Sequence, residues 1–180
     1  MSASELVPLI VDLDGTLVLG ETSLQSAAAA FARDPARAAM ALFKTSAGRA
    51  ASKQAFARVA RPEPSTLKYR GPLLTFLERE RKRGRPLYLV TGADETIARE
   101  IADHIGLFCG VRGSDGAINL KGARKRAWLS ARFPHGYDYA GDSAADLPIW
   151  RSVGRAMLVG RAIGFADLLR REGVQILATI

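Results

Sequence analysis

Short apolar runs alternate with amphipathic stretches over most of the chain, and turn residues separate them. The apolar runs predict buried strands at residues 6–13, 86–90, 108–111, 137–140 and 155–159, and an edge strand at 174–177. The amphipathic stretches predict helices at 72–83, 95–105, 122–133 and 163–171, with a short helix after residue 142. Strand and helix in alternation are typical of βαβ units. We therefore predict an α/β fold with a doubly wound, Rossmann-like parallel sheet.

The segment between the first two predicted strands has a different pattern. Residues 22–60 are rich in helix-forming side chains and divide into three stretches, which begin near Thr22, Pro35 and residue 50. The apolar positions that fall together on these stretches are Leu24, Ala28 and Phe31, then Met40 and Phe43, then Phe56 and Val59. We expect Met40 and Phe43 to face inward. Residues 17–70 are predicted to be a small helical cap, inserted into a core domain of residues 1–16 and 71–180.

The composition indicates one globular domain in a reducing setting. The chain has 180 residues, of which 48% are hydrophobic and 24% charged, and no apolar run is long enough to cross a membrane. The first eight residues lack the pattern of a secretory signal, so we expect a cytoplasmic protein. The single cysteine, Cys109, excludes an intrachain disulfide and a cysteine-rich zinc site, and we expect it to be a small core residue.

The net charge of +8 is distributed unevenly along the chain. Residues 21–70 contain nine basic and three acidic side chains, so this segment has most of the excess positive charge. Such a field favours anionic partners, namely phosphorylated metabolites, anionic lipid surfaces or nucleic acid. A solvated basic face that aids solubility explains the charge equally well. The charged run at 78–85 is expected to be a solvated helix end, and His104 and His135 to be structural or exposed.

Polar side chains follow the predicted strands at the edge where parallel sheets bind their ligands. Asp12 and Asp14 follow the first strand, Thr91 the second, and Asp142 the fourth, with Asp146 four residues later. Carboxylates gathered at one edge repel one another unless a cation lies between them, and Mg²⁺ prefers oxygen ligands. A carboxylate beside Mg²⁺ can attack phosphorus and form an aspartyl-phosphate. The pattern therefore indicates phosphoryl chemistry.

A phosphate group has candidate partners at two further places in the sequence. Thr91 can donate its hydroxyl, and the N–H of Gly92 lies near a helix N-terminus. Lys121 precedes another predicted helix and can hold a phosphate as a point charge, with Lys125 as the alternative. Ser143 is expected to cap a loop, because no histidine is placed in the sequence to activate it.

Taken together, these residues resemble the four motifs of the haloacid dehalogenase superfamily. The matching segments are Asp12-Leu-Asp-Gly-Thr16, Thr91-Gly92, Lys121 and Gly141-Asp-Ser-Ala-Ala-Asp146. The helical insert after the first motif is similar to the cap of the phosphoserine-phosphatase-like branch. The motif sequences resemble still more closely those of the hydrolase domain found ahead of some membrane prenyltransferases of the 4-hydroxybenzoate polyprenyltransferase type. The segments that resemble this group are Asn119-Leu-Lys-Gly122, Tyr139-Ala-Gly-Asp-Ser143 and Asp146-Leu-Pro-Ile-Trp150.

The resemblance implies a role for each motif residue. Asp12 would be the nucleophile and a Mg²⁺ ligand, and Asp14 would act as general acid and base and bind the ion through its carbonyl. Thr91, Gly92 and Lys121 would bind the phosphoryl group. Asp142 would complete the metal site, with Asp146 binding the ion directly or bracing the loop. Ala145 replaces the Asn usual in phosphoserine phosphatases, which argues against phosphoserine as the substrate.

The expected function is Mg²⁺-dependent hydrolysis of a phosphomonoester through an aspartyl-phosphate. The substrate would be a small metabolite or a phosphorylated lipid or sugar-lipid intermediate. By resemblance, we also expect a functional link to a membrane prenyltransferase and contact with the inner face of the membrane, and no nucleic acid partner. The alternative is a non-catalytic module that docks on nucleic acid or anionic membrane through the basic insert.

Overall fold

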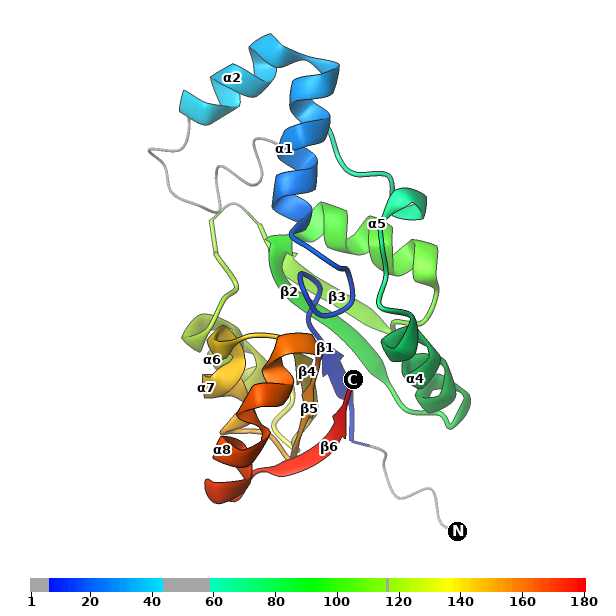
Figure 1. The fold of residues 1–180 in the computed structure, drawn as a ribbon, viewed down its shortest axis with the longest axis vertical. Helices are drawn as coiled ribbons and strands as arrows, with labels where there is room; N and C mark the ends of the chain where they lie inside the picture. Colours follow the sequence, from blue (N-terminus) through cyan, green and yellow to red (C-terminus); the bar gives the residue numbers. More distant parts are fainter. Residues whose placement is uncertain (1–6, 44–58, 116) are drawn as a thin grey trace.

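The protein is built around one six-stranded parallel sheet, with the strand order β3-β2-β1-β4-β5-β6 (Figure 1). The computed structural model describes residues 7–43, 59–115 and 117–180. The strands are β1 (Leu9–Val11), β2 (Leu87–Asp94), β3 (Gly110–Ser114), β4 (Asp138–Gly141), β5 (Arg155–Leu158) and β6 (Gln175–Thr179). This order reverses direction at β1, and the doubly wound α/β fold predicted from the sequence is confirmed.

Helices cover both faces of the sheet. They are α1 (Thr22–Arg33), α2 (Pro35–Phe43), α4 (Gly71–Lys82), α5 (Glu95–Ile105), α6 (Ala123–Arg132), α7 (Leu147–Trp150) and α8 (Ala166–Arg171). Short 3₁₀ segments are η2 (Pro64–Thr66), η3 (Ala144–Asp146) and η4 (Gly160–Phe165). None of the helices in the described ranges has the length and apolar character needed to span a bilayer.

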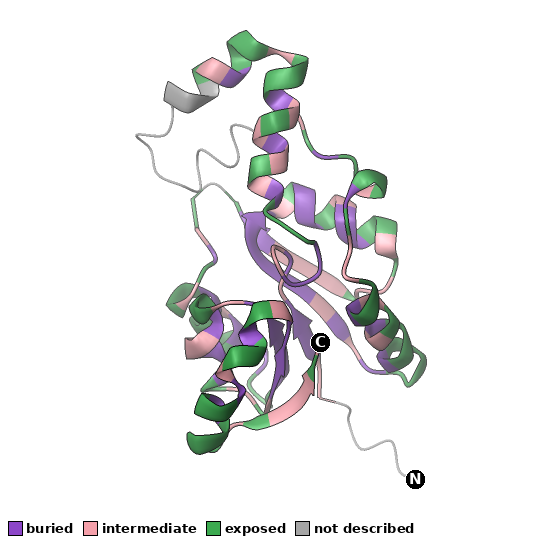
Figure 2. Ribbon diagram, viewed as in Figure 1, coloured by how far each residue is buried: buried purple, intermediate pink, exposed green. Residues whose placement is uncertain are grey.

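Successive residues of the central strand β1 supply two separate cores. Leu9 and Val11 pack with α4 and α5 on one face, whereas Ile10 packs with α6, α7 and α8 on the other. This division follows from the alternation of side chains along a strand, because both faces of a parallel sheet are covered by helices. Figure 2 shows the result, with buried strands in the interior and exposed outer faces on the helices.

The predicted elements are present, with shifted boundaries. Pro8 has no N–H for the ladder, and β1 begins only at Leu9. Strand β2 continues beyond residue 90 to Asp94, which pairs with Ser114 of β3 after a register shift. Asp94 also caps α5 by accepting from the N–H groups of Thr96 and Ile97.

The described part of the insert includes η2 and the two helices α1 and α2, which extend away from the sheet at the top of Figure 1. Its predicted third stretch, near residues 50–60, lies almost entirely outside the described residues, as does Phe56. The expected inward orientation of Met40 is wrong, because this side chain is 64% exposed. Helix α1 likewise exposes Leu24 and Phe31 and buries small or short side chains, namely Thr22, Ser26 and Ala30. The buried side of α1 is therefore not the side on which its larger apolar residues lie.

The charged run at 78–85 is only partly solvated, which corrects the sequence-based expectation. The side chain of Arg85 is 2% exposed; it donates to the carbonyl of Val7 (2.8 Å) and pairs with Glu80 (2.9 Å) and with Asp138 of β4. Arg155 of β5 also pairs with Asp138 (2.7 Å). These residues join α4, β4 and β5 at the amino ends of the strands.

Three smaller expectations concern single side chains. Cys109 is exposed, because it lies in the loop before β3 and not within a strand, so its expected place in the core is wrong. His104 and His135 are exposed, as expected. His104 stacks on Tyr69, with 6.1 Å between the ring centroids.

Candidate active site

The residues that follow β1, β2 and β4 meet in a single cavity of about 480 Å³. Because these strands are neighbours in the sheet, their carboxyl ends lie side by side. The cavity is lined by Asp12, Asp14, Gly15, Leu19, Gly20, Glu21, Arg70, Thr91, Gly92, Lys121, Asp142, Ser143 and Arg161. Of the residues singled out from the sequence, Lys125 and Asp146 lie behind this wall.

Asp12 lies at the centre of the cavity wall, directly after β1. One of its oxygens, Oδ1, accepts from the N–H of Leu13 (2.8 Å) and pairs with Lys125 Nζ (3.0 Å). Lys125 extends from α6, is 2% exposed, and also donates to the hydroxyl of Tyr139 (2.9 Å). The buried ammonium thus fixes the orientation of the Asp12 carboxylate and compensates part of its charge.

Asp12, Asp142 and Asp146 form a group in which one carboxylate oxygen from each lies within 4.8 Å of the others. Asp146 is held by the hydroxyl of Tyr139 (2.8 Å) and by Ser143, which caps η3 as predicted from the sequence. Three converging carboxylates form a set of hard oxygen donors, which is suited to Mg²⁺. The residues therefore fit the metal expected from the sequence.

The acidic group contains more negative charge than its surroundings compensate. Burial, followed by the charge of Asp12, raises the pKa of Asp146 to about 6, although Lys125 and the Tyr139 hydroxyl act in the opposite direction. Burial and Asp12 also raise the pKa of Asp142, against the effect of Arg161. A bound divalent cation would relieve this repulsion, because it stabilises the charged forms of all three carboxylates.

The turn after Asp14 requires a glycine. Gly15 has φ +75°, and a Cβ at this position would collide with the carboxylate of Asp142. Without a side chain here, the loop after β1 can approach the loop after β4 closely enough to complete the acidic group.

Asp14 does not belong to the acidic group. Its Oδ1 accepts from both the N–H (2.8 Å) and the hydroxyl (2.7 Å) of Thr22, the first residue of α1. Burial raises the pKa of Asp14, with Asp12 and Glu21 adding to the rise and the two Thr22 hydrogen bonds opposing it. Asp14 therefore retains its proton more readily than an ordinary aspartate, and it does not share its hydrogen bonds with Asp12. Such a carboxyl group is suited to proton transfer.

On the other side of Asp12, Thr91 and Gly92 form a wall of polar backbone and hydroxyl groups. The Thr91 hydroxyl accepts from the N–H of Ala93 (3.0 Å), which leaves its own hydrogen available for a ligand. A Cβ at Gly92 would lie 3.1 Å from Cγ of Lys121, so these two residues are in close contact. The structure thus places Lys121 beside Thr91 and Gly92, near the carboxyl end of β2, and Lys125 on Asp12.

Ser114, which was not identified from the sequence, holds this wall together. Its buried hydroxyl donates to the carbonyl of Gly92 (2.9 Å) and accepts from the N–H of Leu120 (3.0 Å). It therefore connects the residues next to Thr91 and Lys121. The sequence gives no signal for this role, because the predicted third strand ended at residue 111.

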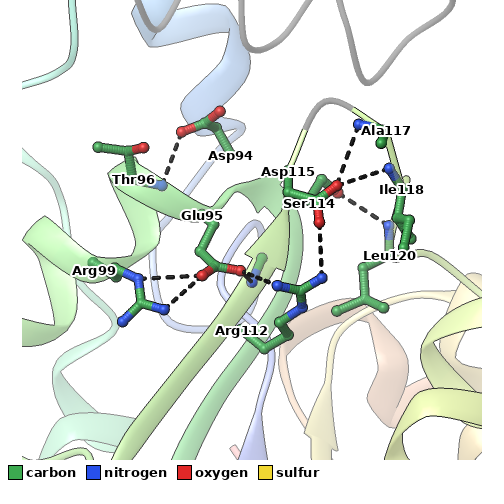
Figure 3. Close-up of polar contacts among 11 residues, drawn as sticks. Asp94, Glu95, Thr96, Arg99, Arg112, Ser114, Asp115, Ala117, Ile118 and Leu120 are labelled. Carbon is green, nitrogen blue, oxygen red and sulfur yellow. Dashed lines mark hydrogen bonds and ion pairs between the residues drawn. The ribbon is translucent and has the colours of Figure 1, made fainter.

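An ionic network around Arg112 supports the loop that leads from β3 to Lys121 (Figure 3). Arg112 pairs with both Glu95 at the start of α5 and Asp115 (2.9 Å each), and Asp115 accepts from the N–H groups of Ala117 and Ile118. The network fixes the start of the loop that leads to Lys121.

Two arginines were also missed. Arg70 and Arg161 both line the cavity, and Arg161 Nε contacts Asp142 Oδ2 at 3.3 Å. Arg161 comes shortly after the fifth predicted strand, so the rule that located Asp142 could have found it.

Comparison with known proteins agrees with this arrangement. Residues 9–151 match the family model described as haloacid dehalogenase-like hydrolase. The chain is 45% identical over 170 residues to an uncharacterised protein of Sinorhizobium fredii designated y4nM; the match covers 94% of the chain. The chain spans about a third (33%) of the length of that relative.

Solved structures share the fold at low sequence identity. A protein of unknown function from Bordetella pertussis Tohama I has a TM-score of 0.63 at 17% identity, over 94% of this chain and 96% of that one. An apo phosphoserine phosphatase has a TM-score of 0.62 at 15% identity, over 98% and 94% of the two chains. A phospho-aspartyl intermediate analogue of phosphoserine phosphatase has a TM-score of 0.60 at 15% identity, over 97% and 92%.

Proposed function

The chain belongs to the haloacid dehalogenase-like hydrolase family, and on that premise we propose that it is a Mg²⁺-dependent phosphatase that hydrolyses a phosphomonoester through an aspartyl-phosphate on Asp12. The observation that carries this proposal is the acidic group itself. Asp12 faces a cavity, within 4.8 Å of two further carboxylates and beside a fourth that is held separately. The fold shared with the phospho-aspartyl analogue of phosphoserine phosphatase supports the same chemistry.

In the first half of the reaction, Asp12 attacks phosphorus and the bond to the leaving oxygen breaks. Asp14 gives its proton to that oxygen, which its raised pKa favours. In the second half, Asp14 takes a proton from a water molecule, which attacks the phosphoryl group and frees Asp12. When bound to Asp12, Asp142, Asp146 and the carbonyl of Asp14, Mg²⁺ would supply positive charge that screens the carboxylates and the phosphate oxygens from each other.

The neighbouring residues divide the remaining tasks. Thr91, Gly92 and Lys121 hold the phosphoryl oxygens, because they line the wall beside Asp12. Lys125 keeps Asp12 oriented through the 3.0 Å ion pair, and Tyr139 relays the same constraint to Asp146. Each lysine of the pair left open by the sequence thus has a distinct task in this proposal.

The direct test is hydrolysis of a panel of phosphomonoesters with Mg²⁺ and with the metal removed by chelation. The wild type should release phosphate only with the metal, and acid quenching should trap phosphate on Asp12. Asp12→Asn should lower turnover by at least about 10⁴-fold while the protein stays folded. Asp167→Asn, on the exposed surface of α8, is the matched control. Full activity of Asp12→Asn, or equal activity without metal, would overturn the proposal.

We further propose that the substrate includes phosphorylated lipid or sugar-lipid intermediates, and that the protein works beside a membrane prenyltransferase. The resemblance of the motif sequences to the prenyltransferase-associated hydrolase domain supports this proposal. The exposed apolar side chains of Leu24, Phe31 and Met40 on the insert support it as well. The test compares a polyprenyl monophosphate in vesicles with a short alkyl phosphate in solution. A clear preference for the short substrate would reject the lipid as the substrate class.

Docking through the basic insert is the competing function. Four of its nine basic residues, at positions 44, 49, 53 and 58, lie outside the described residues. Docking predicts binding that weakens steeply with salt and is unchanged in Asp12→Asn. Catalysis predicts instead that phosphate release is lost in Asp12→Asn.

A further inference from the structure

The cavity has a positively charged side that the proposed reaction does not use. Arg70 and Arg161 line it, whereas Thr91, Gly92 and Lys121 line the side near β2. Arg161 lies on η4, directly after β5, and Lys121 lies beside Gly92 of β2. In the sheet order, β5 and β2 lie on opposite sides of β1.

Arg161 is an accessible and incompletely paired cation. Its side chain is 79% exposed, and its Nε donates to Asp142 at 3.3 Å. Within the part of the chain that the structure describes, neither of its two terminal nitrogens has a hydrogen-bond acceptor. Two amino groups of a planar guanidinium are thus available for bidentate binding of a carboxylate or phosphate.

Arg70 is fixed next to it. Its Nε and Nη2 donate to the carbonyls of Thr16 (3.0 Å) and Gly15 (2.8 Å). The same guanidinium lies against Gly160, because a Cβ at that position would be 3.0 Å from Nη2 of Arg70. Since Gly160 immediately precedes Arg161, the two arginines form one continuous positive wall, which we call the arginine wall.

The position of the arginine wall sets a distance from the reacting phosphorus. Neighbouring strands are about 4.8 Å apart, so β5 lies roughly 10 Å from β1 across β4. Arg161 reaches back toward β4, where it contacts Asp142. An anion bound there would lie about 5–10 Å from the phosphoryl group on Asp12.

We propose that the arginine wall binds a second anionic group of the substrate, so that the preferred substrates are phosphomonoesters with a carboxylate or second phosphate about 5–10 Å from the scissile phosphate. This inference rests on the proposed phosphatase function. A solvated role explains Arg161 poorly, because an exposed arginine with one long hydrogen bond adds little stability. A cation beside Asp142 also opposes metal binding, unless a substrate anion compensates its charge.

The experiment uses three substrates built on a three-carbon chain, namely propyl phosphate, 3-(phosphonooxy)propanoate and propane-1,3-diyl bisphosphate. The wild type should prefer one or both compounds with a second anionic group over propyl phosphate by at least about tenfold in kcat/KM, mainly through KM. The comparison of these two compounds distinguishes a carboxylate from a phosphate as the second group. Arg161→Gln should reduce the preference to within about threefold. The control Arg171→Gln, which removes the same charge from the exposed end of α8, should retain it.

A binding measurement separates this inference from the proposed function. The corresponding non-hydrolysable phosphonates, with and without the second anion, are titrated calorimetrically into the wild type and Arg161→Gln in the presence of Mg²⁺. Tighter binding of the phosphonate with the second anionic group, by the wild type alone, supports the arginine wall even if no phosphoester is hydrolysed. Equal affinity for the two phosphonates, or an equal loss of both in Arg161→Gln, overturns it whatever the turnover.

Discussion

At the amino ends of the strands, the buried carboxylate of Asp138 lies between the guanidinium groups of Arg85 and Arg155. At the carboxyl ends, Asp12, Asp142 and Asp146 converge with Lys125 as their buried cationic partner. The first cluster is compensated by arginines. The second lines a cavity, and burial together with the charge of Asp12 raises the pKa of Asp142 and Asp146. The contrast indicates that the amino end of the sheet stabilises the fold, whereas the carboxyl end gathers carboxylates that the proposed reaction would use.

Among the tests of this contrast, the largest expected effect concerns Asp14 at the carboxyl end. Asp14→Asn should lower turnover of an alkyl phosphate by about 10³-fold, because the poor leaving group needs a proton. With p-nitrophenyl phosphate, whose leaving group needs none, the variant should release a burst of nitrophenol and then turn over slowly. Stopped-flow absorbance measures the burst. An equal loss on both substrates with no burst would contradict the role of Asp14 as proton donor.

The next effect tests the amino end. Arg85→Met should lower the free energy of unfolding by about 3–5 kcal/mol, because Glu80 and Asp138 would remain buried with a missing partner. Urea unfolding measures the change. Arg83→Met is a matched control, since Arg83 pairs with the same Glu80 from an exposed position and should cost no more than about 1 kcal/mol. Similar losses in both variants would show that burial of the pair is unimportant.

The third effect is a pH dependence of opposite sign to ordinary acid denaturation. The pKa of Asp146 is raised from its usual value to about 6 in the folded state. The folded state therefore binds more protons than the unfolded chain between about pH 4 and about pH 6. In metal-free buffer, this group should cost about 3 kcal/mol of stability as the pH rises through that window, after which the loss levels off.

Unfolding curves across that range, with and without Mg²⁺, measure this slope. Saturating Mg²⁺ should reverse it, because the ion binds the deprotonated carboxylates. The difference between the wild type and Asp146→Asn isolates the contribution of this residue. If the stability of the metal-free wild type and of metal-free Asp146→Asn changes equally with pH, the proposed cost of the charged Asp146 side chain is contradicted.

The smallest effect concerns Ser114. Ser114→Ala should cost about 1–2 kcal/mol of stability, since Gly92 and Leu120 lose their buried partner. If Ser114 positions Lys121, the variant should also lower kcat/KM about tenfold in the wild type but hardly at all in a Lys121→Ala background. Ser65→Ala, at an exposed position, serves as the control. Equal losses of activity in both backgrounds would reduce Ser114 to a structural role.

The sheet could be predicted from the sequence because buried strands leave a strong local signal. Every strand of the sheet was located, because each is a short apolar run between turn residues. The boundaries of β1 and β3 were not predictable to the residue, because Pro8 and the register shift at Asp94 act through pairing with neighbours.

The site could be predicted only to the level of the strand ends. Asp12, Asp142 and Asp146 were placed together by the rule that parallel strands end at one edge. The same rule could not show that the Asp14 side chain turns away toward Thr22, or that Lys125 is the lysine on Asp12. Those facts depend on how α1 and α6 are rotated against the sheet, which the sequence does not encode locally. Arg85 was misjudged for a related reason, since its partner Asp138 is 53 positions away.

The contact between Asp14 and Thr22 has a consequence for exchanging the insert between proteins. Both donors that hold the Asp14 carboxyl belong to the first residue of α1, so the orientation of this carboxyl, the proton donor of the proposed reaction, depends on the insert and not on the sheet alone. A chimera that receives a foreign insert must therefore begin it with a hydroxyl side chain at this junction. Without that side chain, the transplanted segment would alter the reaction chemistry as well as the choice of substrate.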